Sequence, residues 1–423
     1  MDYSPRIVDA ELTAMLAGLP AIALDGPKAV GKTATASRRA GSIIQLDDPD
    51  QLALLQADRE RITRLSRPVL LDEWQTFPAI WDTVRRSVDH DARPGQYILA
   101  GSASPTKAPA HSGAGRIVHL RMRPMAFSER QLTPPTVSLG TLLAGPPAAI
   151  EGASPLTLED YASEVTRSGF PAIRLQTKEY RSATLDGYLS AIVEHDFPEA
   201  GYAVRRPATL RAWLAAYAAA SSTTASYDSI IRAATPGDAV KPSKATAQDY
   251  REMLTKLWLL DQVPGWLPSR NRLKGLGQAP KHHLADPALA ARLLRVSAET
   301  LINKADIGPA ELRNGPMLGA LFESLVTLSV RVYAQAAGAS VHHLRTHGGE
   351  HEVDLIIERP DGRVVALEVK LSGTVDDKDT RHLRWLADEI GPDLVDSAVI
   401  TTGKVAYRRT DGIAVIPLGL LGP

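Results

Sequence analysis

One octapeptide near the N-terminus restricts the fold of this chain more than any other feature of its sequence. It consists of Gly26, Pro27, Lys28, Ala29, Val30, Gly31, Lys32 and Thr33, and Ala34 follows it. Two glycines separated by four residues, then a lysine and a hydroxyl side chain, form a phosphate-binding pattern when a strand precedes them and a helix follows. Both conditions are met, because residues 21–24 are apolar and residues 34–40 favour a helix. The pattern therefore predicts a phosphate-binding loop within an α/β domain.

The chemistry of this loop predicts its ligand. The glycines let backbone N–H groups converge on phosphate oxygens, and the N-terminus of the following helix adds positive partial charge. Lys32 is expected to neutralise the β and γ phosphates, and the hydroxyl of Thr33 to bind Mg²⁺. We therefore expect the loop, from Gly26 to Ala34, to bind a purine nucleoside triphosphate, namely ATP, with Mg²⁺. The alternative is a glycine-containing turn without a ligand, and such turns rarely have this strand-to-helix context.

Two carboxylates, Asp72 and Glu73, end a second apolar run that covers residues 68–71. Asp72 is expected to hold Mg²⁺, and Glu73 to act as general base on the attacking water. The alternative is an ordinary apolar strand whose end meets solvent with a charged residue, because such a strand has the same pattern. Together with the phosphate loop, the pair of carboxylates indicates ATP hydrolysis.

A third strand and an arginine complete the candidate hydrolysis site. The strand 96–100 is followed by Ser102, which either senses the γ-phosphate or is an ordinary serine in a turn. Arg116 could stabilise the charge of the transition state, on the nucleotide of its own chain or on that of a neighbouring copy. Arg121 and Arg123 alternate with apolar residues, and a solvated strand face explains both of them equally well.

The order of the apolar patterns divides the chain into three regions. In the first region, short apolar strands at residues 21–24, 42–46, 68–72 and 96–100 alternate with predicted helices at residues 34–40, 50–66 and 80–88. This order is typical of a three-layer α/β domain with a parallel sheet. The second region is mainly helical, and in the third a long apolar-faced helix precedes three strands. The expected domains are residues 1–145, 156–305 and 306–423.

The third region contains a second set of charged residues. Asp354, Glu368 and Lys370 lie on two adjacent predicted strands, and Glu323 lies on the helix before them. Because side chains alternate along a strand, Glu368 and Lys370 share one face. In a metal-dependent nuclease, carboxylates of this kind hold Mg²⁺ and the lysine orients or activates water. The alternative is an ordinary ion pair between Asp and Lys, since one fold hosts many functions.

Several strings distributed over most of the chain resemble a prokaryotic group of AAA-type ATPases that carry a C-terminal domain of unknown function. They are residues 26–33, 71–75, 99–102, 125–129, 168–172, 322–326, 352–354 and 367–370. The resemblance implies an AAA-type P-loop NTPase domain, a helical winged-helix-like middle region and a C-terminal α/β domain like that of restriction endonucleases. Lys28 stands where this group is expected to have Arg, a difference that leaves phosphate binding intact.

The middle region is a candidate for binding DNA. Residues 227–234 and 243–257 are predicted to form the two helices of a helix-turn-helix, and Ser243 to cap the second helix. A strand at residues 259–263 is predicted to follow them. Two groups of side chains are the candidate contacts. Lys244, Thr246 and Gln248 would face a major groove, and Arg270, Arg272, Lys274 and Lys281 would contact phosphate. The alternative is a helical lid that mediates only protein contacts.

The composition narrows the classes of function. Lys and Arg number 48 together, as do Asp and Glu, so no global charge indicates a nucleic-acid partner. The absence of cysteine excludes disulfides, thiolate metal sites and cysteine nucleophiles. Because we find neither a secretory signal nor an apolar segment of bilayer length, we expect a cytoplasmic protein without membrane contact. Frequent Ala, Arg and Pro indicate a bacterial source.

Three functions are compatible with these patterns, and all three have ATP and ADP as ligands. The first is a Mg²⁺-dependent ATP hydrolase that couples hydrolysis to domain movement, on DNA or without it. The second is an ATP-regulated nuclease that cuts with the C-terminal carboxylates. The third is a nucleotide-switched module that binds a protein partner without significant turnover. The sequence leaves open whether the chain forms a homo-oligomer.

Overall fold

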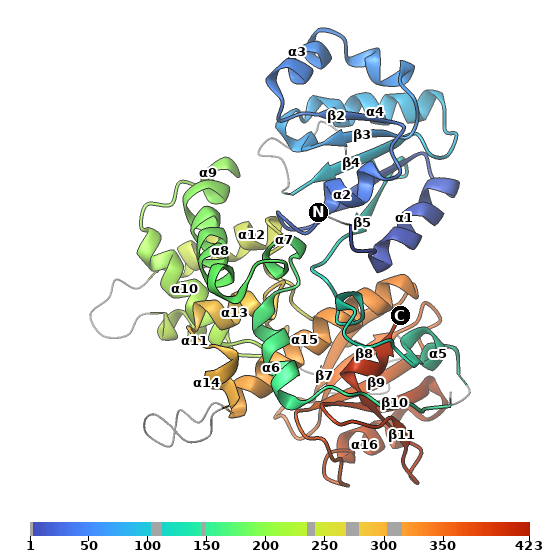
Figure 1. Ribbon diagram of the computed structural model, residues 1–423, viewed down its shortest axis with the longest axis vertical. Coiled ribbons are helices and arrows are strands. Elements are labelled where there is room, and N and C mark those ends of the chain that lie inside the picture. Colours follow the sequence, from blue (N-terminus) through green and yellow to red (C-terminus); the bar gives the residue numbers. More distant parts are fainter. Residues whose placement is uncertain (1–2, 103–111, 146–148, 235–241, 268–278, 303–314) are drawn as a thin grey trace.

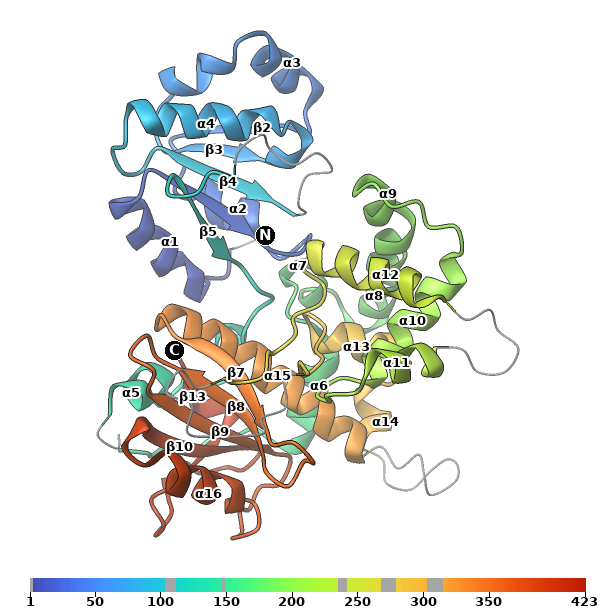
Figure 2. The same cartoon turned by 180° about the vertical axis from the view of Figure 1, so that it is seen from behind.

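A computed structural model describes residues 3–102, 112–145, 149–234, 242–267, 279–302 and 315–423. The chain forms two α/β units and a group of helices beside them (Figure 1). The N-terminal unit lies at one end of the long axis and the C-terminal unit at the other end. The helices of the middle region lie to one side of both units in two opposite views (Figure 1 and Figure 2).

The N-terminal unit contains a sheet of five parallel strands in the order β2-β3-β4-β1-β5. The strands are β1 (Ala21–Asp25), β2 (Ser42–Gln45), β3 (Val69–Asp72), β4 (Tyr97–Gly101) and β5 (Ile117–Arg121). Because the strands are parallel, their carboxyl ends all lie at one edge of the sheet. Ligands of open α/β sheets bind at this edge. The loop between β1 and α2 (Lys32–Ser37) is part of it.

Helices cover both faces of this sheet. Ile22 of β1 packs in one core with residues of α1 (Ile7–Gly18). Its neighbour Ala23 packs in a second core with residues of α3 (Pro49–Ala57) and α4 (Ala79–His90). Successive strand residues point to opposite faces, so the two cores are the two interfaces of a three-layer arrangement.

The sequence predicted most of this unit correctly. The four predicted strands coincide with β1 to β4 to within one residue at each end, and the α/β fold with a parallel sheet is confirmed. Two differences concern helices. Helix α1 had no counterpart among the predictions. The segment expected to be one helix from residue 50 to residue 66 is α3 followed by a separate 3-10 helix, Arg59–Arg64, because Asp58 between them leaves helical geometry.

The described part of the middle region consists mainly of helices. They are α6 (Leu158–Arg167), α7 (Pro171–Arg174), α8 (Lys178–Ala191), a π-helical turn (Ile192–Asp196), α9 (Phe197–Glu199), α10 (Pro207–Ala219), α11 (Tyr227–Ala233), α12 (Lys244–Lys256), α13 (Pro287–Leu293) and α14 (Ala298–Ile302). Helices α11 and α12 coincide with the two helices predicted for a helix-turn-helix. Ser243 caps α12 as expected, since its hydroxyl accepts a hydrogen bond of 3.0 Å from the Thr246 backbone N–H.

The strand predicted at residues 259–263 is not formed. Leu260 and Val263 instead make isolated bridges to Leu284 and Lys281. A winged helix would have a wing strand at this position, and the structure has only these short bridges. The winged-helix description of the middle region stays a prediction.

The C-terminal unit is a mixed sheet of six strands in the order β11-β12-β10-β9-β8-β7. The strands are β7 (Ser340–Arg345), β8 (Glu352–Glu358), β9 (Val364–Lys370), β10 (Leu394–Thr401), β11 (Tyr407–Arg408) and β12 (Ala414–Pro417). Helix α16 (Arg381–Ile390) packs on one face, and α15 (Gly315–Ala336) and α5 (Leu139–Ala144) pack on the other. The short strands β6 (Val137–Ser138) and β13 (Leu421–Gly422) pair with each other, so residues that precede the middle region return to this unit.

Helix α15 has the length and composition of a membrane span over Pro316–Ala336. The expectation that no segment is long and apolar enough to cross a bilayer is therefore wrong. However, 67% of that window is buried inside the protein. Phe322, Leu325 and Val326 are among its fully buried residues. The helix contacts α6, α13 and strands of the C-terminal sheet, as a core helix does.

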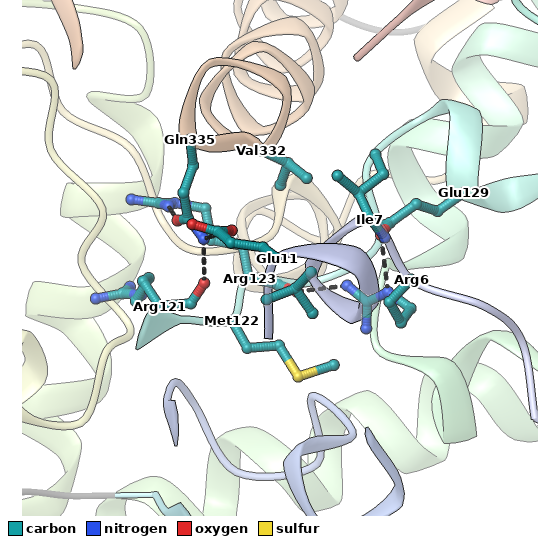
Figure 3. A pocket seen from close by; sticks show the side chains of 10 residues that line it. Arg6, Ile7, Glu11, Arg121, Met122, Arg123, Glu129, Val332 and Gln335 are labelled. Atoms are coloured by element: carbon teal, nitrogen blue, oxygen red, sulfur yellow. Dashed lines mark hydrogen bonds and ion pairs between the residues drawn. The ribbon is translucent and has the colours of Figure 1, made fainter. Parts of the chain in front are cut away.

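The carboxyl end of α15 also contacts the N-terminal unit (Figure 3). Gln335 donates hydrogen bonds of 2.9 Å to the Glu11 carboxylate and to the backbone carbonyl of Arg121. Arg123 donates to the amide oxygen of Gln335 at 3.0 Å and pairs with Asp261 at 2.8 Å. The side chains of Arg121 and Arg123 are only 18% and 10% exposed, so their interpretation as a solvated strand face is wrong.

Candidate nucleotide-binding site

The phosphate loop leaves the sheet at the carboxyl end of β1 and leads into α2. Ala29 and Gly31 have left-handed backbone conformations, with φ of 63° and 104°. Gly26 approaches another segment so closely that a Cβ atom would lie 2.2 Å from the carbonyl oxygen of Met122. Glycine is thus required at the two positions for different reasons. Gly26 approaches a neighbouring backbone closely, and Gly31 has a positive φ.

Lys32 points into the loop. Its Nζ donates hydrogen bonds of 2.8 Å to the backbone carbonyls of Gly26 and Pro27, and the residue is 6% exposed. Burial lowers the pKa of Lys32 to about 8, although the carboxylates of Glu73 and Asp72 favour the charged form. The ammonium group therefore lies within the cradle that the loop backbone forms.

The two residues predicted to hold Mg²⁺ are in contact. The Thr33 hydroxyl donates a hydrogen bond of 3.0 Å to Oδ1 of Asp72, the last residue of β3. Burial raises the pKa of the Asp72 carboxyl, and the hydrogen bond from Thr33 opposes that shift. A hydroxyl and a carboxylate supply the hard oxygen ligands that Mg²⁺ prefers, so these two side chains fit the ion.

The predicted base and the predicted sensor are also neighbours. Glu73 has a left-handed backbone conformation, with φ of 50°, directly after β3. The Ser102 hydroxyl, which follows β4 and is buried, donates a hydrogen bond of 3.3 Å to Oε2 of Glu73. The side-chain amide of Gln75 contacts the same oxygen. Gln75 has no signal in the sequence that predicts this contact, because a residue two positions after the base has no spacing that marks it.

Lys28 of the loop is turned toward the middle region. Its Nζ pairs with Asp196 at 2.7 Å and with Glu199 at 2.9 Å, and the Tyr188 hydroxyl donates to the Lys28 carbonyl at 3.2 Å. Burial would lower the pKa of Lys28, but the two carboxylates raise it above its ordinary value. The sequence predicted Lys28 as part of the loop and did not identify these partners, which lie more than 150 positions away in the chain.

Arg116 lies away from the residues described above. It directly precedes β5, so it is at the amino edge of the sheet, whereas the phosphate loop is at the carboxyl edge. Its guanidinium pairs with Asp89 of α4 at 2.7 Å, and its side chain is 47% exposed. The structure does not bring Arg116 to the phosphate loop of its own chain. Action on the nucleotide of a neighbouring copy stays a prediction.

A cavity of about 760 Å³ opens beside the phosphate loop. Gly31 of the loop and Thr35 of α2 line it. Tyr3 of the N-terminal segment, Arg38 at the end of α2 and Gln131 line it as well. The Arg38 guanidinium lies over the Tyr3 ring, 4.5 Å from its centroid. Burial raises the pKa of Tyr3 to about 12. The sequence analysis did not identify Tyr3 or Arg38, because only tertiary structure brings them to the loop.

The four residues of the possible nuclease site gather in the C-terminal unit. Lys370 pairs with Glu368 at 2.8 Å, and Asp354 accepts a hydrogen bond of 2.9 Å from the backbone N–H of Val369. Glu323 of α15 shares a partner with Asp354, as described next. Burial raises the pKa values of Glu323 and Glu368, and the nearby Asp354 carboxylate adds to the shift.

The partner that Glu323 and Asp354 share is Lys281. Its Nζ lies 2.8 Å from Glu323 and 2.9 Å from Asp354, and its side chain is 1% exposed. The prediction that Lys281 contacts DNA phosphate is therefore wrong, because the ammonium is buried between carboxylates of this chain. The other predicted phosphate contacts, Arg270, Arg272 and Lys274, lie outside the described residues.

The geometry of the N-terminal unit defines a class of protein. A phosphate loop after the first strand, acids after β3 and a serine after β4 meet at one edge of a parallel sheet. Residues 19–131 match a family described as an AAA domain, and residues 318–421 match a domain of unknown function, DUF4143. The chain thus contains a P-loop domain of the AAA type, followed at its C-terminal end by a DUF4143 domain. Residues 158–300 match a second domain of unknown function, DUF8612.

Two mycobacterial proteins are similar to this chain over nearly its whole length. They are uncharacterized proteins of Mycobacterium bovis and Mycobacterium tuberculosis, each 24% identical over 427 residues, which covers 97% of this chain and 83% of the relative. Two solved structures are also similar to part of this chain. A Walker-type ATPase of Pyrococcus abyssi has a TM-score of 0.38 at 14% identity, with 67% of this chain and 94% of that chain covered. The ORC2 protein of Aeropyrum pernix, in ADPNP and ADP complexes, has a TM-score of 0.30 at 14% identity, with 69% and 93% covered.

Proposed function

We propose that this protein binds ATP with Mg²⁺ at the carboxyl edge of the N-terminal sheet and hydrolyses it. Two hydrogen bonds between side chains carry the proposal. Thr33 donates to Asp72, and Ser102 donates to Glu73, so three separate segments contribute to one site. Asp72 and Glu73 are adjacent in the chain, so the metal ligands and the base lie side by side. A loop that only turned the chain would not require this set.

Each residue has one task in this proposal. Lys32 neutralises phosphate oxygens of the bound nucleotide. Thr33 and Asp72 hold Mg²⁺, which when bound screens the negative charge of the β and γ phosphates. Glu73 accepts a proton from the attacking water as general base. Ser102 orients the Glu73 carboxylate through its hydrogen bond, and it lies where a γ-phosphate can be sensed.

The nucleoside part of ATP is proposed to occupy the cavity beside the loop. Its volume of about 760 Å³ is within the range of small-molecule sites. The cavity adjoins the phosphate loop at Ala29 and Gly31, so a ligand with its phosphates in the loop has its base directed toward it. Tyr3 and Arg38 offer a ring and a planar guanidinium against which a purine can stack.

Coupling between the nucleotide and the middle region is proposed to run through Lys28. Its ammonium belongs to the phosphate loop by position, yet its partners are Asp196 and Glu199 of the middle region. A triphosphate in the loop competes with these carboxylates for the same ammonium. Nucleotide binding therefore weakens the contact, and the π-helical turn and α9, which carry the two carboxylates, are freed to move.

Hydrolysis is tested by phosphate release from purified protein with ATP and Mg²⁺. Lys32→Ala should lose nucleotide binding and turnover together. Glu73→Gln should keep ATP bound and lose turnover, because the amide accepts no proton from water. Glu60→Gln, at an exposed site on the same domain, is the matched control and should behave as the wild type. A wild-type rate in Glu73→Gln would show that Glu73 is not the base, and a wild-type rate no higher than that of Lys32→Ala would favour the nucleotide-switched module.

DNA binding by the middle region is a finer proposal that rests on helix α12. Lys244, at its first turn, has a side chain that is 81% exposed, and the helix begins at the cap that was predicted for a recognition helix. Lys244 pairs with Asp228 of α11 at 2.9 Å, so a DNA phosphate would have to replace that carboxylate. The test is fluorescence anisotropy with labelled duplex DNA: Lys244→Ala should weaken binding, and equal binding would contradict the proposal.

A further inference from the structure

Four carboxylates and two lysines, some buried and some partly exposed, form a cluster at the C-terminal unit, which we call the acidic cluster. Its members are Glu323 on α15, Glu352 and Asp354 on β8, Glu368 and Lys370 on β9, and Lys281 from the segment that precedes α13. The carboxylates are in the order in which a nuclease-like fold would hold a divalent metal. Whether these carboxylates can bind a metal depends on their contacts with the two lysines.

Lys281 occupies the centre of the acidic cluster. Its Nζ lies 2.8 Å from Glu323, 2.9 Å from Asp354 and 3.4 Å from Glu352, and solvent reaches only 1% of its side chain. Three carboxylates from two elements thus surround one ammonium. This is the position in which a shared cation of these carboxylates would lie, and an ammonium fills it.

The backbone fixes Lys281 in this position. Its N–H donates to the carbonyl of Val263 at 2.9 Å, and the Val263 N–H donates back at 3.0 Å. The segment that contains Val263 continues to Trp266, whose N–H donates to the carbonyl of His343 on β7 at 2.7 Å. Lys281 therefore enters the acidic cluster from a segment bound to the edge of the C-terminal sheet, and its insertion is part of the fold.

The remaining carboxylate oxygens are largely engaged as well. Oδ2 of Asp354 accepts the backbone N–H of Val369 at 2.9 Å, and Oε1 of Glu368 accepts from Lys370 at 2.8 Å. Oε2 of Glu368 is the buried cluster oxygen without a partner among the described residues. In that same part of the chain, no three His, Asp or Glu side chains are arranged to hold a metal. The residues present therefore do not fit a divalent ion.

We propose that Lys281 is the resident cation of the acidic cluster, that it takes the place of a divalent metal, and that this site consequently neither binds Mg²⁺ or Mn²⁺ nor cleaves nucleic acid. The cluster then has a different task. It joins the middle region, through Lys281, to α15 and β8 of the C-terminal unit. This inference is independent of the proposed ATP hydrolysis, because it uses no residue of the phosphate loop.

The first test uses the wild-type protein without nucleotide. Mn²⁺ is titrated by calorimetry into the wild type and into Asp354→Asn. The expected result is that the two titrations agree, because metal bound elsewhere does not depend on Asp354. A site of one Mn²⁺ per chain in the wild type that Asp354→Asn lacks would overturn the proposal. So would Mg²⁺-dependent strand breakage that is lost in Asp354→Asn while ATP turnover is unchanged.

The second test removes the ammonium. Lys281→Met keeps the length of the side chain and leaves Glu323 and Asp354 without their cation, so the melting temperature should fall by roughly 5 °C or more. Millimolar Mn²⁺ should raise the melting temperature of Lys281→Met and leave that of the wild type unchanged. Lys256→Met, at an exposed site of α12, is the control and should resemble the wild type in both respects. An unchanged melting temperature in Lys281→Met would overturn the proposal.

A third variant covers the case in which Lys281→Met does not fold. Lys281→Met combined with Asp354→Asn and Glu323→Gln removes the cation and two of its anions together. If the cluster is held by Lys281 as its cation, this triple variant should be soluble and melt at a higher temperature than Lys281→Met alone. A triple variant as unstable as the single variant would show that Lys281 acts through packing, and the proposal would fail.

Discussion

The hydroxyl of Thr33 lies 3.0 Å from the carboxylate of Asp72, although the two residues are 39 positions apart in the chain. The contact joins the first turn of α2 to the end of β3. It depends on the sheet order, which places β3 and β1 on the two sides of β4 with their carboxyl ends at one edge. Ser102 follows β4 at the same edge. The parallel order of the sheet therefore places Thr33, Asp72 and Ser102 close together.

The Thr33 hydroxyl should set the Mg²⁺ requirement of ATP turnover. In Thr33→Ala the metal loses one of its two protein ligands, so turnover should fall by about tenfold or more and half-maximal activity should need more Mg²⁺. The measurement is phosphate release over a Mg²⁺ titration. Thr33→Ser keeps a hydroxyl and should retain most of the activity. Wild-type Mg²⁺ dependence in Thr33→Ala would mean that Thr33 is not a ligand.

The ammonium of Lys32 should make nucleotide affinity depend on pH. Burial lowers the pKa of Lys32 to about 8, so the amine of the free protein loses its proton as the pH rises through that value. Phosphate binding needs the charged form, and affinity should therefore fall above pH 8 by up to about tenfold per pH unit. The stability of the folded protein changes with pH in the opposite direction. The unfolded chain keeps this proton to higher pH, so the free energy of unfolding increases as the pH rises above 8.

Titration of a fluorescent ATP analogue between pH 7 and pH 9.5 measures this dependence. Lys32→Arg keeps its charge over the whole range and should show no such fall in its residual binding. An affinity that is flat across the range in the wild type would contradict the assignment of Lys32 to the phosphates.

The sequence indicated the residues of the proposed hydrolysis site and missed most of their contacts outside it. Asp72 and Glu73 could be found because an apolar strand ends at them, and Ser102 because it follows the next strand. These are local signals. The partners of Lys28 and Lys281 could not be found in this way, because nothing in the chain near Asp196 or Glu323 shows which segment will pack against it. Ion pairs of that kind exist only after the regions have docked.

The same limit explains the wrong predictions. Arg121 and Lys281 both have the sequence context of exposed basic residues, and both are buried beside carboxylates from distant segments. Charge in a sequence predicts exposure only when no partner is available, and long-range packing supplies the partner here. Helix α1 was missed for a different reason. Its N-cap residue is Arg6, which is not among the residues that usually mark a helix start, although Asp9 accepts a hydrogen bond of 2.7 Å from the Arg6 backbone N–H.

The carboxylate of Asp196 should restrain the nucleotide affinity of the loop. Asp196→Asn removes the closer of the two anions that hold Lys28, so the ammonium becomes available to phosphate and ATP should bind about twofold more tightly. The effect is small because the Lys28 side chain is 40% exposed. Glu194→Gln changes an exposed acid two positions away in the chain and is the control. Weaker binding in Asp196→Asn would contradict competition between Asp196 and the phosphates.

Asp261 should stabilise the junction of the three regions. It pairs with Arg123 at 2.8 Å, Arg331 at 3.2 Å and Arg121 at 3.7 Å. Burial would raise the pKa of Asp261, but these guanidinium groups hold it well below its usual range. The stabilisation is therefore present at neutral pH and is lost as the pH falls below the ordinary range of a carboxyl group.

Asp261→Asn leaves three largely buried guanidinium groups without their anion and should lower the free energy of unfolding by about 3 kcal/mol. Urea denaturation at pH 7 measures the change. The control is Asp228→Asn, which breaks the exposed pair with Lys244 and should cost at most about 1 kcal/mol. The difference between the two variants should shrink as the pH falls below the ordinary range of a carboxyl group, because the unfolded chain then binds a proton that the folded Asp261 does not. Equal losses at pH 7 would mean that the junction does not depend on Asp261.

Arg116 should act on the nucleotide of a neighbouring copy, if it acts on a nucleotide at all. It lies at the amino edge of the sheet with a half-exposed side chain, and the phosphate loop of the same chain lies at the opposite edge. Arg116→Ala alone should therefore reduce turnover. Arg93→Ala removes another exposed arginine and should not.

A mixing experiment distinguishes the two geometries. Lys32→Ala chains cannot bind phosphate but carry an intact Arg116, and Arg116→Ala chains have the reverse defect. In a mixed oligomer, the arginine of the first chain can reach the nucleotide of the second, so the mixture should turn over more ATP than the sum of the two proteins measured separately. If Arg116 served its own chain, the mixture would show only that sum. If Arg116→Ala alone turned over ATP at the wild-type rate, Arg116 would have no role in hydrolysis, and its pair with Asp89 would be its structural function.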